Sequence, residues 1–517
     1  MGRKSAGQVT GSLVSPTRLR TLVGVSIRFV ASGCASCHCV ALDVEGRCYT
    51  WGRNERGQLG HGDLIQRNMP TIVSELSKSK IVKAGAGRSH TVVMTEDGKS
   101  FSFGWNKHGQ LGSGSTKNEI EPSPVPCLVS QVTNVVCGGD FTVWLTSVEG
   151  SSIMTAGLPQ YGQLGHGTDN EYNAKDSSVK LVHEPQPRPR AISTLSSKMI
   201  VKVACGTNHT VAVDSGGFVY TWGYGGYGRL GHREQKDEWA PRLVDVFQRH
   251  NVLPPNAVIS AGSASSACTA AGGQLYMWGK LKNSGDDWMY PKPVMDLSGW
   301  NIRCMDSGHM HHVCGADDSC ISWGLSLYGE LGYGPNGQKS SANPKKVDIL
   351  EGMRVMSVAC GAGLSLIVVD RTNIADQLEQ LEIYNGATSL EENENLENDN
   401  KLKKGAPKSP ANRNKRKKTN DSSSDSEDGD ESDDESEQDV SDESNELNKA
   451  SRRGRGGGAK KTAAEANNSS GRSRGRPKSD KSEENKSSGK GRGRPRKAGA
   501  KPSSGRGRGR PRKNASS

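Results

Sequence analysis

An internal repeat constrains the fold of this chain more than any other feature. Two short patterns recur through the first 370 of its 517 residues. The first is an aromatic residue and a glycine, then a Gly-Gln-Leu-Gly turn; the glycines of the pair, counting the degenerate copies, are Gly52, Gly104, Gly157, Gly223, Gly279 and Gly324. The second is a small-residue turn that leads into an apolar run, as at residues 204–211, and it occurs seven times. Regular recurrence of one motif implies stacked structural units.

The spacing of the repeat indicates the kind of unit. Successive glycines of the first pattern are 52, 53, 66, 56 and 45 residues apart, within the range of a four-stranded propeller blade. Between them lie short alternating runs such as residues 217–222, and glycine turns separate these runs. We therefore predict an all-β fold: a seven-bladed β-propeller over residues 21–371, preceded by an N-terminal segment at residues 1–20.

The two patterns together resemble the regulator of chromosome condensation repeat family. Further residues, at 225–244 and 289–303, are similar to the second member of that family. The family pattern places another aromatic-Gly hairpin ahead of Met1, so the first blade is expected to be incomplete. Either the chain is truncated at its start or the C-terminal strands near Val355–Val369 close the ring differently.

The resemblance also implies a partner. Family members bind small GTPases, of the Ran, Rac, Arf or Ral type, and promote guanine nucleotide exchange. Exchange needs no covalent chemistry, because a protein that binds the nucleotide-free GTPase more tightly accelerates nucleotide release. A long insertion at residues 168–191 is the candidate recognition loop.

Other motifs suggest chemistry but have simpler explanations. Cys34, Cys37 and His38 form a Cys-x-x-Cys-His string that could attach haem or bind zinc, yet it occupies a repeat position and has no second Cys-x-x-Cys. Histidine recurs at that position, as in His90 and His209, which favours a turn-stabilising imidazole bonded to backbone. We expect no catalytic set, cofactor or metal. The tryptophans of the repeat are predicted to be packing anchors, and the cysteines are expected to be reduced.

Composition changes sharply after residue 370. Every Cys and Trp lies at or before Cys360. Residues 421–446 carry 14 acids and no base, whereas residues 449–517 carry 23 bases and 4 acids, a net charge of +19. Such blocks repel themselves and cannot bury a core, so we predict a long disordered tail, with a linker at 372–448 and a basic segment at 449–517. One short helix is expected at 374–383. No apolar run is long enough to cross a membrane, so no membrane insertion is expected.

The tail contains two kinds of basic motif. The first has the spacing of a bipartite nuclear import signal and consists of Lys403, Lys404, Lys415, Arg416, Lys417 and Lys418. The second is an Arg-Gly-Arg-Pro core that resembles an AT-hook, in three copies: Arg474, Gly475, Arg476 and Pro477; Arg492, Gly493, Arg494 and Pro495; Arg508, Gly509, Arg510 and Pro511. Glycine allows close backbone approach, and paired arginines suit a narrow A·T minor groove. Three linked copies predict binding to A·T-rich DNA and chromatin, whereas a generic polycation would show no A·T preference.

The acidic block suggests regulation of that binding. Ser424, Ser432 and Ser436 each precede an acid by three residues, a pattern that suits acidophilic kinases. We hypothesise that the block folds back on the hooks and weakens DNA binding. The whole chain is therefore interpreted as a nuclear, chromosome-associated regulator of small GTPases in chromosome condensation or mitosis, with spindle or centromere proteins as further partners. The alternative is a chromatin or cytoskeletal scaffold without exchange activity.

Overall fold

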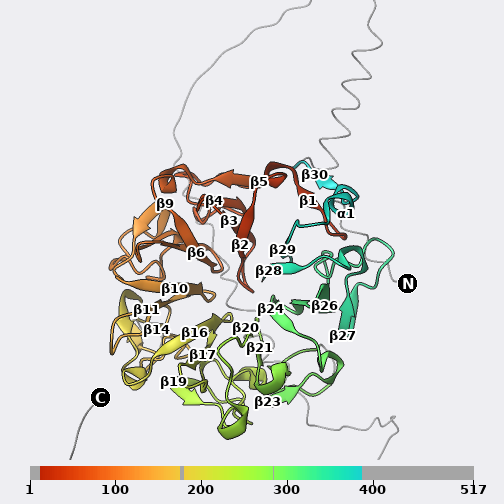
Figure 1. Cartoon of the computed structure of the whole chain (residues 1–517). Helices are drawn as coiled ribbons and strands as arrows, with labels where there is room; N and C mark the ends of the chain where they lie inside the picture. The colour runs from red at the N-terminus through yellow and green to blue at the C-terminus, as the bar shows by residue number, and fades with distance from the viewer. Residues whose placement is uncertain (1–11, 175–179, 283–284, 387–517) are drawn as a thin grey trace, which may run out of the picture. The chain divides into compact units, whose positions relative to one another are not determined.

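Six four-stranded antiparallel sheets stand radially around a common axis in the computed structural model, which describes residues 12–174, 180–282 and 285–386 (Figure 1). Within each sheet the strands pair in chain order, and the first strand lies nearest the axis. The all-β propeller predicted from the repeat is therefore confirmed. No helix among the described residues is long and apolar enough to cross a bilayer.

The strands of the six sheets are short and regular. The first three sheets are β2 (Ile27–Ala31), β3 (His38–Asp43), β4 (Cys48–Gly52), β5 (Arg67–Ile72); β6 (Ile81–Ala86), β7 (His90–Thr95), β8 (Ser100–Trp105), β9 (Ile120–Pro126); and β10 (Val132–Cys137), β11 (Phe141–Thr146), β12 (Ile153–Gly157), β15 (Gln186–Ala191). The next three are β16 (Ile200–Cys205), β17 (His209–Asp214), β18 (Val219–Gly223), β19 (Glu238–Leu243); β20 (Ile259–Ala261), β21 (Ser265–Thr269), β22 (Leu275–Gly279), β23 (Trp288–Pro293); and β24 (Ile302–Ser307), β25 (His311–Ala316), β26 (Ser319–Leu325), β27 (Ser340–Lys346).

Short 3-10 turns follow several of the outer strands and bury one leucine each: η2 (Ser74–Leu76), η3 (Ser193–Leu195), η7 (Met295–Leu297) and η8 (Asp348–Leu350). Four further turns are η1 (Arg20–Leu22), η4 (Gly226–Gly228), η5 (Arg249–Asn251) and η6 (Ala271–Gly273).

The first sequence pattern forms the third strand of each sheet and the turn that follows it. In the fourth sheet, the Thr221 hydroxyl donates to the carbonyl oxygen of Leu230 at 2.7 Å, and Leu230 is fully buried. Gly223 has a φ of 101°, and a Cβ there would lie 2.4 Å from the carbonyl oxygen of Asn208. Only glycine fits such a position, because other residues rarely adopt positive φ. The glycine of the aromatic-Gly pair is thus required because the main chain passes close to Asn208 at this point.

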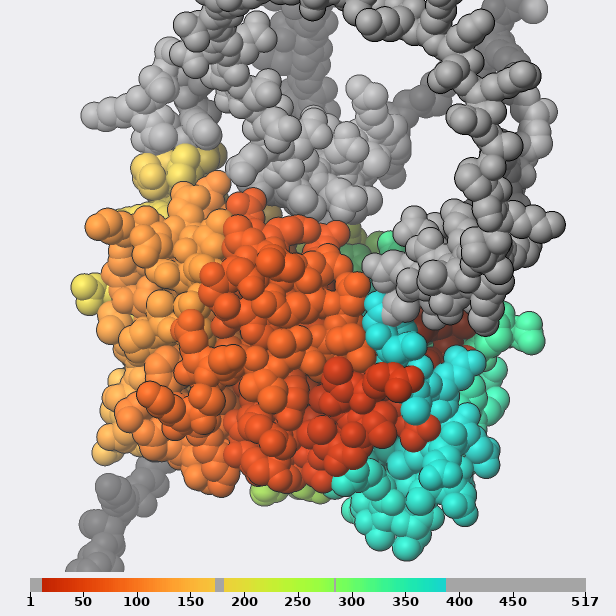
Figure 2. Space-filling model, turned by 90° about the horizontal axis from the view of Figure 1, so that it is seen from above, coloured from red at the N-terminus to blue at the C-terminus, as the bar shows by residue number. Residues whose placement is uncertain are grey.

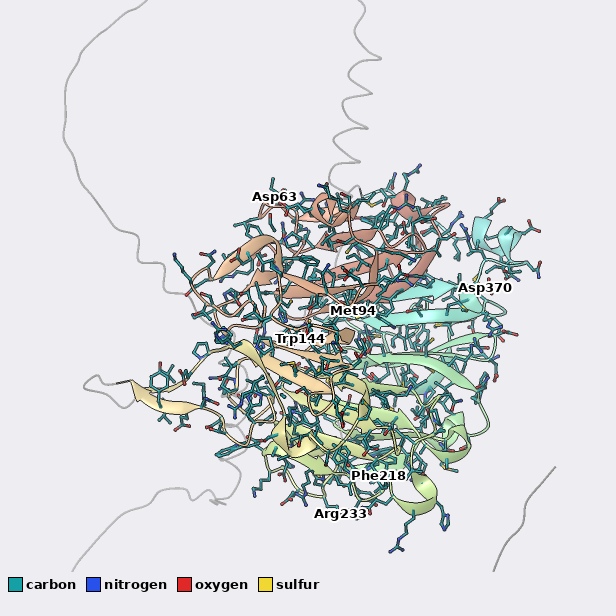
Figure 3. The ribbon with its side chains drawn as sticks, turned by 60° about the vertical axis from the view of Figure 1, so that its left-hand side comes forward. Asp63, Met94, Trp144, Phe218, Arg233 and Asp370 are labelled. Carbon is teal, nitrogen blue, oxygen red and sulfur yellow. The ribbon has the colours of Figure 1, made fainter. Side chains whose placement is uncertain are left out.

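The core lies between neighbouring sheets. Trp222 is fully buried, and its Nε1 donates to the carbonyl oxygen of Gln163 in the preceding sheet at 2.9 Å. Its indole occupies the space beside Gly165, where a Cβ would lie 2.9 Å from Nε1. Trp144 and Met94 lie in a similar interior position (Figure 3), and both belong to one cluster of buried apolar side chains. The predicted packing role of the repeat tryptophans is confirmed by the burial of Trp51, Trp222, Trp278 and Trp323.

The predicted number of blades is wrong. A two-stranded sheet, β28 (Val355–Cys360) and β29 (Ser365–Val369), stands between the sixth sheet and the first, so six blades have four strands among the described residues. The first blade, expected to be incomplete, has all four strands, and it is the last sheet that has two strands in the part of the chain that the structure describes. The physical reason is that each aromatic-Gly motif supplies one third strand. Six such motifs complete six sheets, and the seventh small-residue turn is followed by none.

The two ends of the described chain meet beside this last sheet. β1 (Arg18–Leu19) pairs in parallel with β30 (Ile383–Tyr384), and α1 (Ala375–Glu379) covers part of the helix predicted at 374–383. The predicted end is wrong, because Ile383 pairs with Arg18 in a strand. Ile374 is buried against a cluster that includes Val355 and Cys360. Figure 2 shows the N-terminal residues in red beside the C-terminal ones in cyan. The described residues outside the expected limits of 21 and 371 therefore pack on the ring.

Candidate functional site

Buried histidines connect neighbouring sheets through hydroxyl groups. The Nε2 atoms of four histidines lie within hydrogen-bond distance of a hydroxyl on the second strand of the next sheet: His38 with Thr91 at 2.7 Å, His90 with Thr142 at 2.9 Å, His209 with Ser266 at 2.9 Å and His311 with Ser365 at 3.0 Å. Each hydroxyl donates its own proton to a main-chain carbonyl oxygen of the preceding turn, at Gln58, Gln110, Arg229 and Glu330. The hydroxyl oxygen is therefore the acceptor, and Nε2 carries the imidazole proton.

These imidazoles are structural. Burial lowers the pKa of His38 and His90 to about 3, because desolvation disfavours the charged ring. An imidazole that stays neutral and donates a hydrogen bond to the hydroxyl of the next sheet links the two sheets. The predicted partner was backbone within the turn; the structure corrects this to a side-chain hydroxyl some fifty residues away, as in the pair His90 and Thr142. Spacing within one repeat could not reveal a partner in the next one.

The Cys-x-x-Cys-His string does not gather its side chains around one point. Cys34 is buried and lies 3.4 Å from the Thr207 hydroxyl, whereas Cys37 is exposed. Burial raises the pKa of Cys34 to about 11, which opposes formation of the thiolate that zinc requires. All twelve cysteines of the chain have free thiols.

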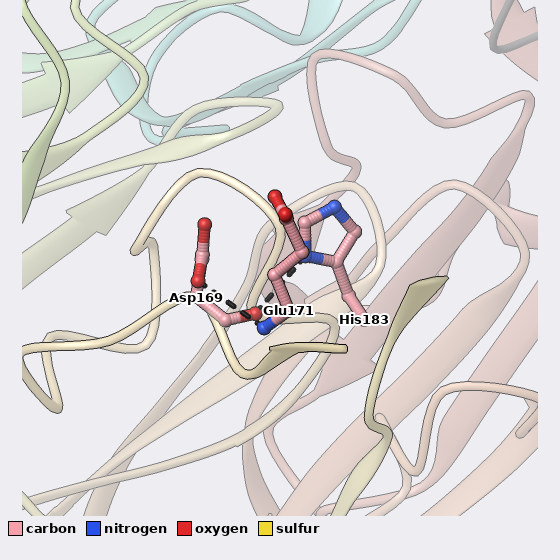
Figure 4. Close-up of side chains that lie close together, drawn as sticks. All are labelled: Asp169, Glu171 and His183. Atoms are coloured by element: carbon pink, nitrogen blue, oxygen red, sulfur yellow. Dashed lines mark hydrogen bonds between the residues drawn. The ribbon is translucent and has the colours of Figure 1, made fainter. Parts of the chain in front are cut away.

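The long insertion forms a β-hairpin, β13 (Glu171–Ala174) and β14 (Lys180–His183). At its base, Asp169, Glu171 and His183 each present one ligand atom, and these atoms lie within 4.8 Å of one another (Figure 4). Within the described ranges this is the one such group of three. The Nδ1–H of His183 donates to the carbonyl oxygen of Asp169 at 3.1 Å, so Nε2 holds the free lone pair. The sequence did not indicate this group, because only the hairpin register places Glu171 opposite His183.

The same hairpin exposes apolar side chains. Tyr172 is 49% exposed and Leu181 is 58% exposed. Tyr172 pairs with Val182, so Leu181, the neighbour of Val182, lies on the opposite face of the hairpin. At the base, Gly167 N donates to the carbonyl oxygen of Trp239, whose side chain is 47% exposed. Figure 3 shows this hairpin projecting from the body of the propeller. It is a protruding element with apolar groups on both faces.

A second surface combines aromatic rings with cations, and we call it the aromatic–basic surface. It consists of Tyr224, Tyr227, Arg233, Lys280, Trp288, Tyr290 and Lys292, from the turns and outer strands of the fourth and fifth sheets, and buried Arg229 lies against two of its rings. Arg229 lies over Tyr224 at 4.6 Å, and its guanidinium donates to the carbonyl oxygens of Gly226 and Ser263. Burial lowers its pKa to about 10, so Arg229 remains charged at neutral pH. Exposed Arg233 lies over Tyr290 at 4.4 Å.

Comparison with known proteins agrees with the geometry of the ring. The model of the regulator of chromosome condensation (RCC1) repeat matches residues 45–94, 97–145, 154–213, 216–269 and 317–368, which hold most of the strands of the ring. The chain belongs to the RCC1 repeat family. Its sequence is 39% identical to the protein RCC2 homolog of Xenopus laevis over 394 residues, 73% of this chain and 75% of that protein. It is also 39% identical to human protein RCC2, over 73% of this chain and 74% of the relative.

A solved structure with the same fold is that of Prp20p from Saccharomyces cerevisiae, described together with its binding properties to Gsp1p and histones. The match has a TM-score of 0.54 and 20% identity, and it covers 68% of this chain and 84% of that one. At this identity it supports the RCC1 type of propeller and nothing finer.

The remaining predicted sites of this RCC1 repeat chain lie outside the described residues. These are the nuclear import signal, the three serines of the acidic block and the three AT-hook cores, all beyond residue 386. Of the predicted interaction sites, the structure describes the insertion at 168–191, except for residues 175–179.

Proposed function

We propose that this chain is a nuclear, chromatin-associated propeller that promotes nucleotide release from a small GTPase. The observation that carries the proposal is the projecting pair of strands β13 and β14, on which Tyr172 and Leu181 are exposed. Large apolar side chains exposed on a projecting element are candidate contacts for a partner protein. The RCC1 family resemblance favours a GTPase as that partner.

The chemistry of the two surfaces suits this task. A hairpin with apolar side chains on opposite faces can enter a groove of the partner and hold open the nucleotide site. The aromatic–basic surface supplies arginine and tyrosine, residue types enriched where interfaces carry most of their binding energy. The cations Arg233, Lys280 and Lys292 of this surface suit acidic side chains of a partner.

Chromatin association is proposed for the tail. The three Arg-Gly-Arg-Pro cores hold A·T-rich DNA, the signal at Lys403 to Lys418 directs the chain to the nucleus, and phosphorylation of the acidic block adjusts DNA affinity. Histone binding described for Prp20p is compatible with a chromosomal location for a relative. Spindle or centromere proteins remain proposed further partners.

The test of exchange is release of a fluorescent guanine nucleotide from Ran-, Rac-, Arf- and Ral-type GTPases, measured with the full-length chain. We expect one type to release nucleotide faster, and the double variant Tyr172→Ala/Leu181→Ala to lose most of that acceleration. The matched control is Leu64→Ala/Ile65→Ala, which removes two exposed apolar side chains from the first blade.

Two results would contradict the proposal at different points. Release that is unchanged for all four GTPase types would leave the scaffold as the better explanation. Acceleration that persists in the hairpin variant would mean that the GTPase contacts another part of the propeller. Variants of Arg233 and Tyr290 would then be examined.

A further inference from the structure

The base of the projecting hairpin brings a nitrogen ligand and two carboxylates together. Asp169 precedes β13, Glu171 is the first residue of that strand, and His183 is the last residue of β14. Glu171 and His183 lie directly opposite each other across the two strands, so their side chains are on the same face of the hairpin. One ligand atom of each of the three residues lies within 4.8 Å of the other two (Figure 4). The strand register therefore forms a three-residue group from two separate parts of the chain.

The imidazole of this group is held in one tautomer. The carbonyl oxygen of Asp169 accepts the Nδ1–H of His183 at 3.1 Å, so the lone pair of Nε2 is available to a metal. Histidines that bind metals in proteins commonly make this kind of bond with their other ring nitrogen. The three residues are therefore a mixed nitrogen and oxygen donor set, not a cluster of acids alone.

The charge of the two carboxylates is not balanced by a basic side chain. None of the ion pairs formed by the described residues involves either carboxylate of the group. In the first blade, the acid that follows the same turn is Asp63, and it pairs with Arg67 at 2.8 Å. In the fourth blade, Glu234 pairs with Arg242 at 2.6 Å. The third blade keeps the acid but places a second carboxylate beside it instead of an arginine, so a bound cation would balance the charge.

The donor set indicates the class of ion. Calcium and magnesium prefer ligands that are all oxygen, whereas imidazole suits zinc and other first-row divalent metals. Three protein ligands with water in the remaining position are a common arrangement around zinc. Zinc bonds of about 2.0–2.2 Å place the ligand atoms of one ion about 3–4 Å apart. A small rotation of the exposed Glu171 side chain is enough to reach this spacing from the observed one.

We propose that Asp169, Glu171 and His183 bind one zinc ion, or another first-row divalent metal, at the base of the hairpin. The ion joins residues at the start of β13 to a residue at the end of β14, so it opposes separation of the two strands. These strands carry the exposed side chains of Tyr172 and Leu181. The contact of those side chains with a GTPase belongs to the proposed function, but binding of the metal does not depend on it.

The ion should make the hairpin more rigid by an amount that can be measured. Because the three ligands meet only when β13 and β14 are paired, the ion binds the closed hairpin and stabilises it by mass action. At a free zinc concentration 100 times the Kd, the population of hairpin with separated strands falls about 100-fold. The amide hydrogens that join the two strands exchange with solvent through that opening, so their exchange should slow by about the same factor.

The test measures zinc binding to the full-length chain by competition with a chromophoric chelator, and hydrogen exchange of the hairpin by mass spectrometry. Asp169→Asn and His183→Gln each remove one ligand, and the glutamine amide of the second variant can still donate to the same carbonyl oxygen. We expect each change to weaken binding of one zinc ion at least about tenfold and to abolish the slower exchange. The matched control is Glu149→Gln, which removes an exposed carboxylate from another hairpin of the same blade and should change neither quantity. Thermal unfolding reports that all variants are folded.

Thiols are the competing zinc ligands, so every measurement is made in a Cys37→Ser background, which removes the exposed cysteine. Anomalous scattering at the zinc absorption edge should locate the ion among the three side chains. Equal zinc binding by the parent chain and both ligand variants, an ion located elsewhere, or unchanged hydrogen exchange of the hairpin at saturating zinc would each overturn the proposal. These measurements contain no GTPase, so a failure of nucleotide release and a failure of metal binding are seen separately.

Discussion

Lowering the pH from 7.5 to 5.5 should destabilise the propeller, because its fold depends on neutral imidazoles. Five histidines are buried: His38, His90, His209, His311 and His312. Burial lowers the pKa to about 3 for His38, His90 and His312, to about 4 for His311, and well below the ordinary value for His209. In the unfolded chain each ring titrates near 6.5. The contribution of these five histidines to stability is therefore fully present above pH 6.5, and it is lost as the pH falls from there toward their pKa values in the folded state.

The magnitude follows from proton linkage. At pH 5.5 an unfolded imidazole is about nine-tenths protonated while the folded one is neutral, which costs about 1.4 kcal/mol for each ring. Five rings give about 7 kcal/mol, comparable with the whole stability of a typical domain, roughly 5–15 kcal/mol. The histidine term is therefore large enough to unfold the propeller at mildly acidic pH.

Asp306 acts in the opposite direction. Burial raises the pKa of its carboxyl from 3.8 to about 7, although Cys360 N and the Ser260 hydroxyl donate to it. The folded state therefore takes up a proton at Asp306 as the pH falls through 7, and this stabilises the fold by about 2 kcal/mol at pH 5.5 relative to 7.5. The expected net loss is about 5 kcal/mol.

Urea denaturation at pH 7.5, 6.5 and 5.5, followed by tryptophan fluorescence, measures this loss directly. His90→Gln is the matched variant, because a glutamine amide can still donate to Thr142 but cannot titrate; its stability should fall less steeply with pH, by about one proton. A free energy of unfolding that changes by less than about 1 kcal/mol over this range would refute the reasoning. So would resonances of these five buried imidazoles that titrate near pH 6.5 in the folded protein.

Four further outcomes are expected. Trp222→Ala removes a fully buried indole and should cost about 3–5 kcal/mol in urea denaturation, whereas Trp239→Ala, at a half-exposed position, should cost far less. Gly223→Ala should destabilise more than Gly150→Ala, because both glycines have positive φ but only at Gly223 does the new Cβ meet a carbonyl oxygen; equal thermal shifts would contradict this. Replacement of Arg476, Arg494 and Arg510 by Ala should abolish the preference for A·T over G·C duplexes in binding titrations, and equal loss on both would indicate a simple polycation. Deletion of residues 421–446 should raise DNA affinity at low salt, and unchanged affinity would discard the idea that the acidic block shields the hooks.

The local requirements of the repeat are visible in the sequence. A glycine such as Gly223 sits at a positive φ, Leu230 is buried in the turn, and Trp222 fills the space between sheets. Each requirement concerns residues within one blade or its immediate neighbour, so a recurring motif identifies the propeller, its tryptophan packing and its strands. The short helix α1 lies within the predicted range of 374–383, although the helix ends at Glu379.

The repeat alone did not determine how the ring closes or which side chains meet across it. The sequence indicated a missing hairpin and favoured a defect in the first blade, but the structure completes that blade and leaves the last sheet with two strands. The hydroxyl partner of His90 and the grouping of Asp169 with His183 likewise depend on which strands become neighbours. The local sequence determines the backbone conformation and the buried positions of each strand. The closed ring determines which distant residue contacts that strand, because such contacts form only when the sheets pack against one another.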